Sequence, residues 1–247
     1  VKRPEALLPY AAFLGRRHDT EKALDRCEEA RRQIWPPAAL TAAGVALLCA
    51  VRTPRPADVA RVQEWVMEGL SAAANQPAVA AELLNRQAAL LNLQGKYDEA
   101  IAVYTRLLTL NARDAVAMNN LGYLLAAHKK DFPTALDWVA KAKAVVGPVP
   151  QLLDTEALVY LEKAKAERTE DGKRAAAEAA QTLLGDVEVQ GPSAVTFFHI
   201  ALARRAAGDR GAAKAAWGEA QRRKLTLADL HPLERPDFDA VRADFPG

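Results

Sequence analysis

Small and apolar residues recur at steps of four and three along the chain, which is the spacing of one helix face. The clearest instance is the segment GKYDEAIAVYTRLL, from Gly95 to Leu108, in which Ala100, Tyr104 and Leu107 share a face. Three other segments repeat this order. Their triples are Ala23, Cys27 and Ala30; Ala135, Val139 and Ala142; and Ala213, Trp217 and Ala220. The pattern predicts a set of related amphipathic helices.

A second pattern lies upstream of these segments and predicts a partner helix for each. It has an apolar residue, a small residue four positions later and a large residue three positions after that. It is seen at Leu7, Ala11 and Leu14; Leu40, Gly44 and Leu47; Leu84, Ala88 and Leu91; Met118, Gly122 and Leu125; Leu153, Ala157 and Tyr160; and, with a polar last position, Phe197, Ala201 and Arg204. Two such helices with small faces turned toward each other make a helical hairpin.

The hairpins resemble the tetratricopeptide repeat, whose pattern is W-x2-L-G-x2-Y…A-x3-F…P and whose period is about 34 residues. The step from Ala100 to Ala135 is 35 residues, and Pro148 stands where the closing proline of the family is expected. The resemblance is clear in two adjacent units, 81–114 and 115–148, and weaker elsewhere. We expect six units, at about 4–37, 38–77, 78–114, 115–148, 149–192 and 193–225.

Two of these units depart from the pattern. In the second, the stretch RTPRPAD lengthens the turn, and Val62, Val66 and Gly69 replace the alanine triple of its second helix. In the fifth, the charged stretch LEKAKAERTEDGKR lengthens the predicted first helix.

Each hairpin has an apolar face that it cannot cover alone, so stacking against the next hairpin is required to bury it. We therefore expect an all-α fold, a single solenoid domain over residues 1–247 that is right-handed and superhelical by resemblance to the family. Residues 226–247 are expected to cap its last hairpin. Thr226 and Asp229 have the spacing of a capping box at a helix start. An apolar stripe then follows at Leu233, Phe238, Val241 and Phe245.

Composition and charge narrow the possible partners. The formal net charge of the 247 residues is +2, which provides no general attraction to nucleic acid, so no nucleic acid is expected. The longest run of low charge, Ala38 to Val51, has 14 residues, whereas a membrane span needs about 20. The sequence shows no signal peptide, which favours the cytoplasm. A start at Val1 rather than Met is nevertheless what a piece of a longer protein would show.

The residue types that carry chemistry are scattered. His18, His128, His199 and His231 have no ligand spacing, and none is close to a cysteine, so no metal is expected. Cys27 and Cys49 are isolated in apolar helical stretches and are expected to be buried free thiols. The motifs of phosphate-binding loops, dinucleotide-binding folds, serine hydrolases and zinc proteases are all missing from the sequence. We therefore expect no catalysis and no cofactor.

The resemblance implies that the first helix of each hairpin lines a concave groove. The side chains expected to face that groove are Asn85, Asn92, Asn119, Tyr123, Asp154, Phe198 and Arg205. Asparagine is a poor helix former, and its amide both donates and accepts, which suits contact with a peptide backbone. Hydrogen bonds to neighbouring loops or to water are an equal alternative. The first helices of the third and fourth units lack the lysines of the carboxylate-clamping members, which argues against recognition of a C-terminal carboxylate.

Together these features predict a protein–protein interaction scaffold that binds a peptide or protein segment in its groove. One alternative is a regulatory or targeting segment of a larger multidomain enzyme. Another is an RNA-binding helical-repeat array, which is disfavoured because such an array would carry a stronger basic stripe. The sequence makes no prediction about the oligomeric state or the identity of the partner.

Overall fold

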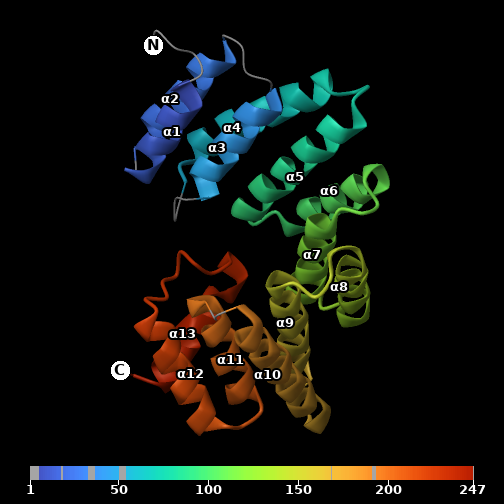
Figure 1. The fold of residues 1–247 in the computed structure, drawn as a ribbon, viewed down its shortest axis with the longest axis vertical. Coiled ribbons are helices and arrows are strands. Elements are labelled where there is room, and N and C mark those ends of the chain that lie inside the picture. Colours follow the sequence, from blue (N-terminus) through green and yellow to red (C-terminus); the bar gives the residue numbers. More distant parts are fainter. Residues whose placement is uncertain are drawn as a thin grey trace. The chain divides into compact units, whose positions relative to one another are not determined.

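The computed structural model describes residues 6–17, 19–32, 37–49, 54–167, 169–190 and 193–246, with the backbone alone at 37–40, 49 and 186–190. Within these ranges the chain forms helices joined by turns, and it contains no strand. The helices fall into two compact units, residues 1–112 and 113–247 (Figure 1).

The first unit consists of three helical hairpins. Its helices are α1 (Leu7–Arg16), α2 (Thr20–Arg31), α3 (Pro37–Cys49), α4 (Pro56–Ala72), α5 (Pro77–Leu93) and α6 (Tyr97–Leu110). The first helices α1, α3 and α5 contact one another in order, while α2 and α4 each contact their own partner and the next first helix. This is the stacking of neighbouring hairpins that the repeat pattern predicts.

Ion pairs join the second helices of the first two hairpins. Arg55 Nη1 lies 3.0 Å from Glu21 Oε2, and Arg61 Nη1 lies 2.9 Å from Asp25 Oδ1. The predicted triple of α2 and the replacement triple Val62, Val66 and Gly69 of α4 are buried. The lengthened turn of the second unit therefore leaves the packing face of its second helix intact.

The second unit contains three further hairpins and a C-terminal segment. Its helices are α7 (Ala115–Leu124), the π-helical turn η2 (Leu125–Lys129), α8 (Phe132–Val146), α9 (Pro150–Ala166), α10 (Glu170–Gln190), α11 (Ala194–Ala206), α12 (Arg210–Arg222), the 3-10 turn η3 (Pro232–Glu234) and α13 (Arg235–Asp244). The first helices α7, α9 and α11 again contact one another in order, and α13 contacts α11. The all-α fold of hairpins with a C-terminal cap is thus confirmed.

Side-chain caps start several of these helices. Asp19, Asp114, Asp131, Ser193 and Asp209 each accept a hydrogen bond from the backbone N–H three residues later. Such a cap satisfies one of the backbone donors that a helix start leaves without a partner. Three of the caps precede the second helices α2, α8 and α12, so the sequence marks the turn of those hairpins directly.

Two expectations about helix boundaries are wrong. Thr226 and Asp229 form a turn in which the N–H and hydroxyl of Thr226 both donate to Asp229 Oδ2 at 2.8 Å, and the helical structure starts later, at Pro232. In the fifth unit, the charged stretch is divided between two helices, since α9 ends at Ala166 and α10 begins at Glu170. Each predicted single helix is therefore interrupted or delayed by a turn.

The cap covers its hairpin with aromatic residues. Phe238 and Val241 of α13, and Phe245 directly after it, are buried in one cluster with Phe198 of α11 and Trp217 of α12. The ring of Phe238 lies edge-on to Trp217, with 5.4 Å between centroids. Because α13 occupies the side of α11 that a further first helix would cover, the last hairpin does not expose its apolar face.

Close packing of α7 on α8 predicts a specific sensitivity at Gly122. A Cβ atom there would meet Val139 Cγ2 at 3.0 Å and the carbonyl oxygen of Ala135 at 3.1 Å. We expect Gly122→Val to lower the free energy of unfolding by about 1–3 kcal/mol, as overpacking does. The control Gly218→Val on α12, where the nearest atom is the flexible end of Arg222 at 3.8 Å, should change it by less than about 0.5 kcal/mol. Denaturant titration of both variants measures the difference, and equal losses would contradict the close approach.

Candidate functional site

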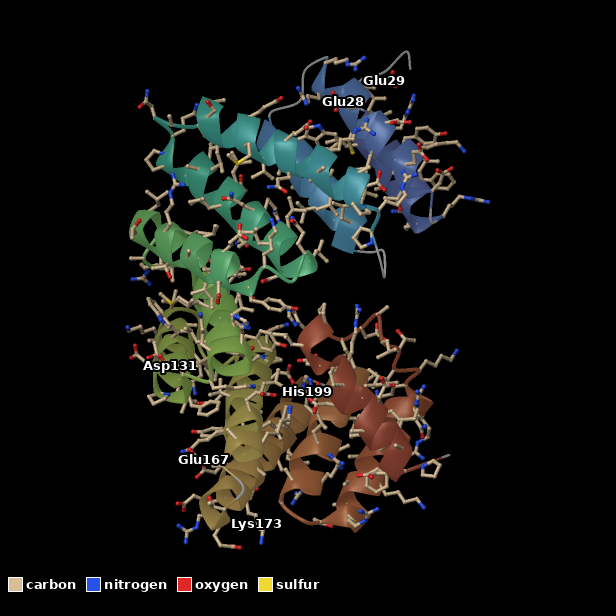
Figure 2. The ribbon with its side chains drawn as sticks, turned by 180° about the vertical axis from the view of Figure 1, so that it is seen from behind. Glu28, Glu29, Asp131, Glu167, Lys173 and His199 are labelled. Atoms are coloured by element: carbon tan, nitrogen blue, oxygen red, sulfur yellow. The ribbon has the colours of Figure 1, made fainter. Side chains whose placement is uncertain are left out.

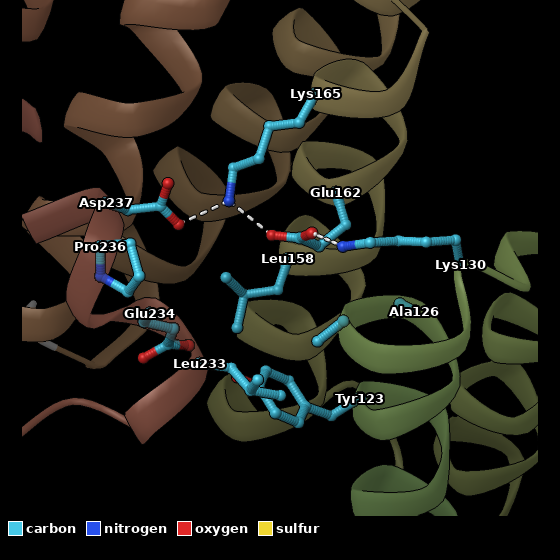
Figure 3. Close-up of a pocket in the computed structure, with 11 residues that line it drawn as sticks. Tyr123, Ala126, Lys130, Leu158, Glu162, Lys165, Leu233, Glu234, Pro236 and Asp237 are labelled. Carbon is cyan, nitrogen blue, oxygen red and sulfur yellow. Dashed lines mark hydrogen bonds and ion pairs between the residues drawn. The ribbon is translucent and has the colours of Figure 1, made fainter. Parts of the chain in front are cut away.

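A pocket of about 220 Å³ lies in the second unit between the first helices and the C-terminal segment (Figure 3). Its first wall is α7 with the turn η2 and Lys130, its second is α9, and its third is η3 with the first turn of α13. The apolar lining residues are Tyr123, Ala126, Ala127, Leu158, Leu233 and Pro236. The chain thus builds a pocket on the inner helices of its fourth and fifth repeats and closes one side with residues near its C-terminus.

The end of α7 is shaped by a π-helical turn, η2, followed by a residue with unusual backbone geometry. Lys130 has φ of 59° and ψ of 27°, which is the left-handed region that residues with a side chain rarely adopt. Gly95 and Gly208 stand at the same distance before the alanines of the third and sixth repeats, and they too have positive φ. The fourth repeat therefore has a lysine where the turn favours glycine.

A row of alternating charges forms the rim of the pocket. Lys130 Nζ lies 2.5 Å from Glu162 Oε2, and Lys165 Nζ lies 2.5 Å from Glu162 Oε1 and 2.6 Å from Asp237 Oδ2 (Figure 3). Burial opposes the charge on Lys165, but Glu162 and Asp237 outweigh it and hold the pKa of Lys165 above its usual value. The lysine is therefore charged at neutral pH.

Behind the pocket, a buried histidine links two first helices to the C-terminal segment. His199 of α11 (labelled in Figure 2) is 1% exposed. Its Nδ1 lies 2.7 Å from Asp154 Oδ1 of α9, and its Nε2 lies 3.6 Å from Glu234 Oε1 of η3. Burial alone would lower the pKa of His199, but the two carboxylates raise it to about 10. Contact with His199 in turn overcomes the effect of burial on Glu234 and lowers the pKa of that carboxyl group. The result is a buried imidazolium held between two carboxylates.

A second histidine, His231, fixes the start of the C-terminal segment against α7. Its ring Nδ1 accepts a hydrogen bond from the backbone N–H of Leu233, and its backbone N–H donates to Glu234 Oε2. His231 and Glu234 thereby form a capping box at η3. The ring of His231 lies edge-on to Tyr123 with centroids 4.8 Å apart. Burial lowers the pKa of His231 to about 4, so this ring is neutral at pH 7.

The seven side chains expected in the groove have different surroundings. Asn85 and Asn92 lie half-buried on α5 in the first unit, and the other five lie in the second unit. Tyr123 lines the pocket, and Asp154 binds His199. Asn119 is half-buried, and its Oδ1, like that of Asn92, is shielded from solvent and has no hydrogen-bond partner among the described residues.

Two of the seven side chains contact the C-terminal cap. Phe198 is 0% exposed in the core beside Trp217 and Phe238, so the expectation that it faces a groove is wrong. Its position follows from the cap, since the side of α11 that would be open is covered by α13. Arg205 Nε donates to Asp244 Oδ2 at 2.5 Å, which also ties α11 to α13.

The sequence reasoning missed the charged residues of the pocket, namely Lys130, Glu162, Lys165, Glu234 and Asp237. Most lie far apart in the chain, and nothing in the local pattern brings Lys165 to Asp237. A signal did exist for Lys130, because alignment of the repeats puts it where two others have glycine.

The remaining expectations concern cysteine, metal and membrane. Cys27 is a free, buried thiol whose pKa burial raises to about 11, while the side chain of Cys49 lies outside the described residues. In the described part of the chain, no group of three or more histidine, cysteine or acidic residues has an arrangement that could hold a metal ion. Nor does any helix described there combine the length and apolar character that crossing a membrane requires.

Comparison with known proteins supports the fold. No protein-family model matches the sequence, and no curated protein sequence matches it. Among solved structures, the chain is similar to BtubC from P. vanneervenii, with a TM-score of 0.59 and 18% identity over 93% of this chain and 94% of that chain.

Two further structures extend this likeness. MamA from Desulfovibrio magneticus RS-1, residues 41 to the end, gives a TM-score of 0.52 and 18% identity over 77% of this chain and 96% of that chain. A tetratricopeptide repeat protein from Parabacteroides merdae gives a TM-score of 0.50 and 15% identity, over 94% of this chain and 97% of that chain. At such low identity, the similarity establishes a fold of tetratricopeptide-like helical repeats.

The two buried histidines predict a stability maximum near pH 6.5. The pKa of His199 is about 10 in the folded chain against 6.5 for the free side chain, so its contribution is complete below pH 6.5 and is lost as the pH rises toward 10. The pKa of His231 is about 4, so between pH 6.5 and 4 the unfolded chain binds a proton that the folded chain excludes, and stability falls. Denaturant midpoints across this range measure both limbs, and a midpoint that rises steadily from pH 6.5 to 10 would contradict the assignment.

Removing the charge of His199 should test the buried link directly. His199→Gln leaves Asp154 and Glu234 without their shared counter-charge, and breaking a buried ion group in this way costs about 3–5 kcal/mol of unfolding free energy. The control is His128→Gln, because His128 is exposed on η2. We also expect the alkaline loss of stability to shrink in His199→Gln, and an unchanged alkaline limb would assign that loss to another group.

Proposed function

We propose that the chain is a protein-interaction module whose second unit binds a peptide or protein segment by taking one apolar side chain of that segment into the pocket. The observation that carries this proposal is the pocket itself, which has an apolar lining and a charged rim and is built by α7, η2, α9 and the C-terminal segment. The tetratricopeptide-like fold supports it, because stacked hairpins of this kind form extended surfaces suited to binding.

The size and lining of the pocket favour a side chain over a free small molecule. Pockets for drug-sized ligands usually enclose about 300–1,000 Å³, which exceeds the 220 Å³ found here. The small side chains of Ala126 and Ala127 leave room in the pocket, and Tyr123, Leu158 and Leu233 surround that room with apolar atoms. Burying one apolar side chain there contributes about 1.5–3 kcal/mol, and further contacts along the segment are needed for stable binding.

Those further contacts are proposed to come from the inner helices. Asn119 lies one turn before Tyr123 on α7, and its Oδ1 has no hydrogen-bond partner among the described residues. Rotation of this half-buried side chain toward the bound segment would let the oxygen accept a hydrogen bond from a peptide N–H. Within the first unit, taken by itself, Asn85 and Asn92 on α5 are proposed to offer the same kind of hydrogen bond to a peptide, as the resemblance to the repeat family suggests. Phe198 and Arg205 take no part in this proposal, because the cap uses them.

The test is to fill the pocket. Ala127→Phe places a ring in the space that a ligand side chain would occupy, and Ala140→Phe adds the same ring at an exposed position of α8. A random peptide library displayed on phage is selected against the intact chain, and the recovered peptides are titrated against each variant. We expect peptides with a shared apolar residue, bound with at least tenfold lower affinity by Ala127→Phe, since the lost burial is about 1.5–3 kcal/mol.

Circular dichroism of both variants confirms that they are folded. Recovered peptides that bind the wild type, Ala127→Phe and Ala140→Phe equally would place binding outside the pocket and contradict the proposal. Failure to recover any peptide that depends on Ala127 would have the same meaning.

A further inference from the structure

The charged rim of the pocket contains two kinds of negative group. Glu162 belongs to α9, and its two oxygens bind Lys130 and Lys165 separately, so it holds both lysines in place. Asp237 belongs to the C-terminal segment and binds Lys165 with one oxygen, Oδ2. Glu162 is therefore a fixed part of the inner surface, whereas Asp237 reaches Lys165 from a different part of the chain.

Lys130 is held in an unfavourable backbone conformation at this rim. A left-handed residue with a side chain is disfavoured relative to glycine, and the matching turns of the third and sixth repeats do have glycine. The Lys130 side chain is half exposed, and its ammonium group pairs with Glu162. A half-exposed pair of this kind contributes little to stability, so it does not by itself explain why a lysine stands there.

The charge balance of the rim depends on Asp237. With Asp237 in place, the two lysines face Glu162 and Asp237 and the rim is neutral. The remaining acidic lining residue, Glu234, faces His199 instead. Without Asp237 the rim would hold two positive groups against one negative group. The surface then favours an anion beside the apolar floor.

We propose that Lys130 and Lys165 recognise an acidic side chain of the partner segment, next to the apolar residue that enters the pocket, and that Asp237 occupies Lys165 until the partner replaces it. The proposal rests on the proposed function and names the chemistry of its ligand. Lysine suits this exchange, because its ammonium group has three donors and can pass from one carboxylate to another without a fixed geometry.

The probes are the Ala127-dependent peptides recovered by phage display, synthesised both as selected and with each acidic residue changed to its amide. Asp237→Asn removes the internal competitor, and we expect it to tighten binding of the acidic peptides about two- to fivefold, the range of a partly exposed ion pair. Lys165→Gln should weaken their binding by a similar factor. The amide peptides should respond to neither change.

A matched control is available on the same helix. Asp239→Asn makes the same chemical change two residues further along α13, where Asp239 pairs with Arg242 on the exposed side. Asp239→Asn should bind every peptide as the wild type does. Equal effects of Asp237→Asn and Asp239→Asn, or recovered peptides that are basic rather than acidic, would overturn the proposal.

Lys130→Gly separates binding from a structural role. Glycine relaxes the turn, so we expect a melting temperature equal to or above that of the wild type, together with about two- to fivefold weaker binding of the acidic peptides. A lower melting temperature with unchanged affinity would show that Lys130 is structural, and the proposal would fail. Peptides that depend on Ala127 but ignore all three charge changes would leave the pocket standing and remove this inference alone.

Discussion

Close contact between paired helices at small residues is the constraint on which the rest of the structure depends. A Cβ atom at Gly122 would lie only 3.0 Å from Val139 and 3.1 Å from the backbone of Ala135, and the alanines at Ala23, Ala100 and Ala213 are fully buried. Helices held this closely have little freedom to rotate about their axes. The remaining positions of each first helix are consequently directed to fixed places, and the pocket inherits its geometry from them.

The hairpins could be predicted because their information is local. Steps of three and four residues define a helix face wherever they occur, and acidic caps and turn glycines mark the boundaries between helices. The same reasoning placed three of the four residues of the predicted stripe in the core, since Phe238, Val241 and Phe245 are buried, whereas Leu233 is half-buried and lines the pocket. It failed at Thr226 because an aspartate three residues after a threonine stabilises a tight turn as well as a helix start.

The candidate site was harder to predict because its members are brought together by the fold. Tyr123 was expected to face inward, and it does line the pocket, but its neighbours His231 and Leu233 come from the opposite end of the second unit. Phe198 occupies the inward position of its repeat and is buried by the cap instead. The repeat pattern assumes that the inner side of every first helix is open. It therefore does not predict that α13 covers the inner side of α11. The buried charge of His199 likewise depends on carboxylates from two other elements, so the sequence around it contains no sign of its state.

The C-terminal segment has two duties that are normally separate: it shields the last hairpin with α13, and it supplies one wall of the pocket through Leu233 and Pro236. These two roles of one segment have an evolutionary consequence. A few substitutions between His231 and Asp237 would reshape what the pocket accepts while the stacked hairpins stay as they are. Diversification of recognition in proteins built this way would then accumulate in a short stretch outside the repeats, and comparison of the repeats alone would overlook it.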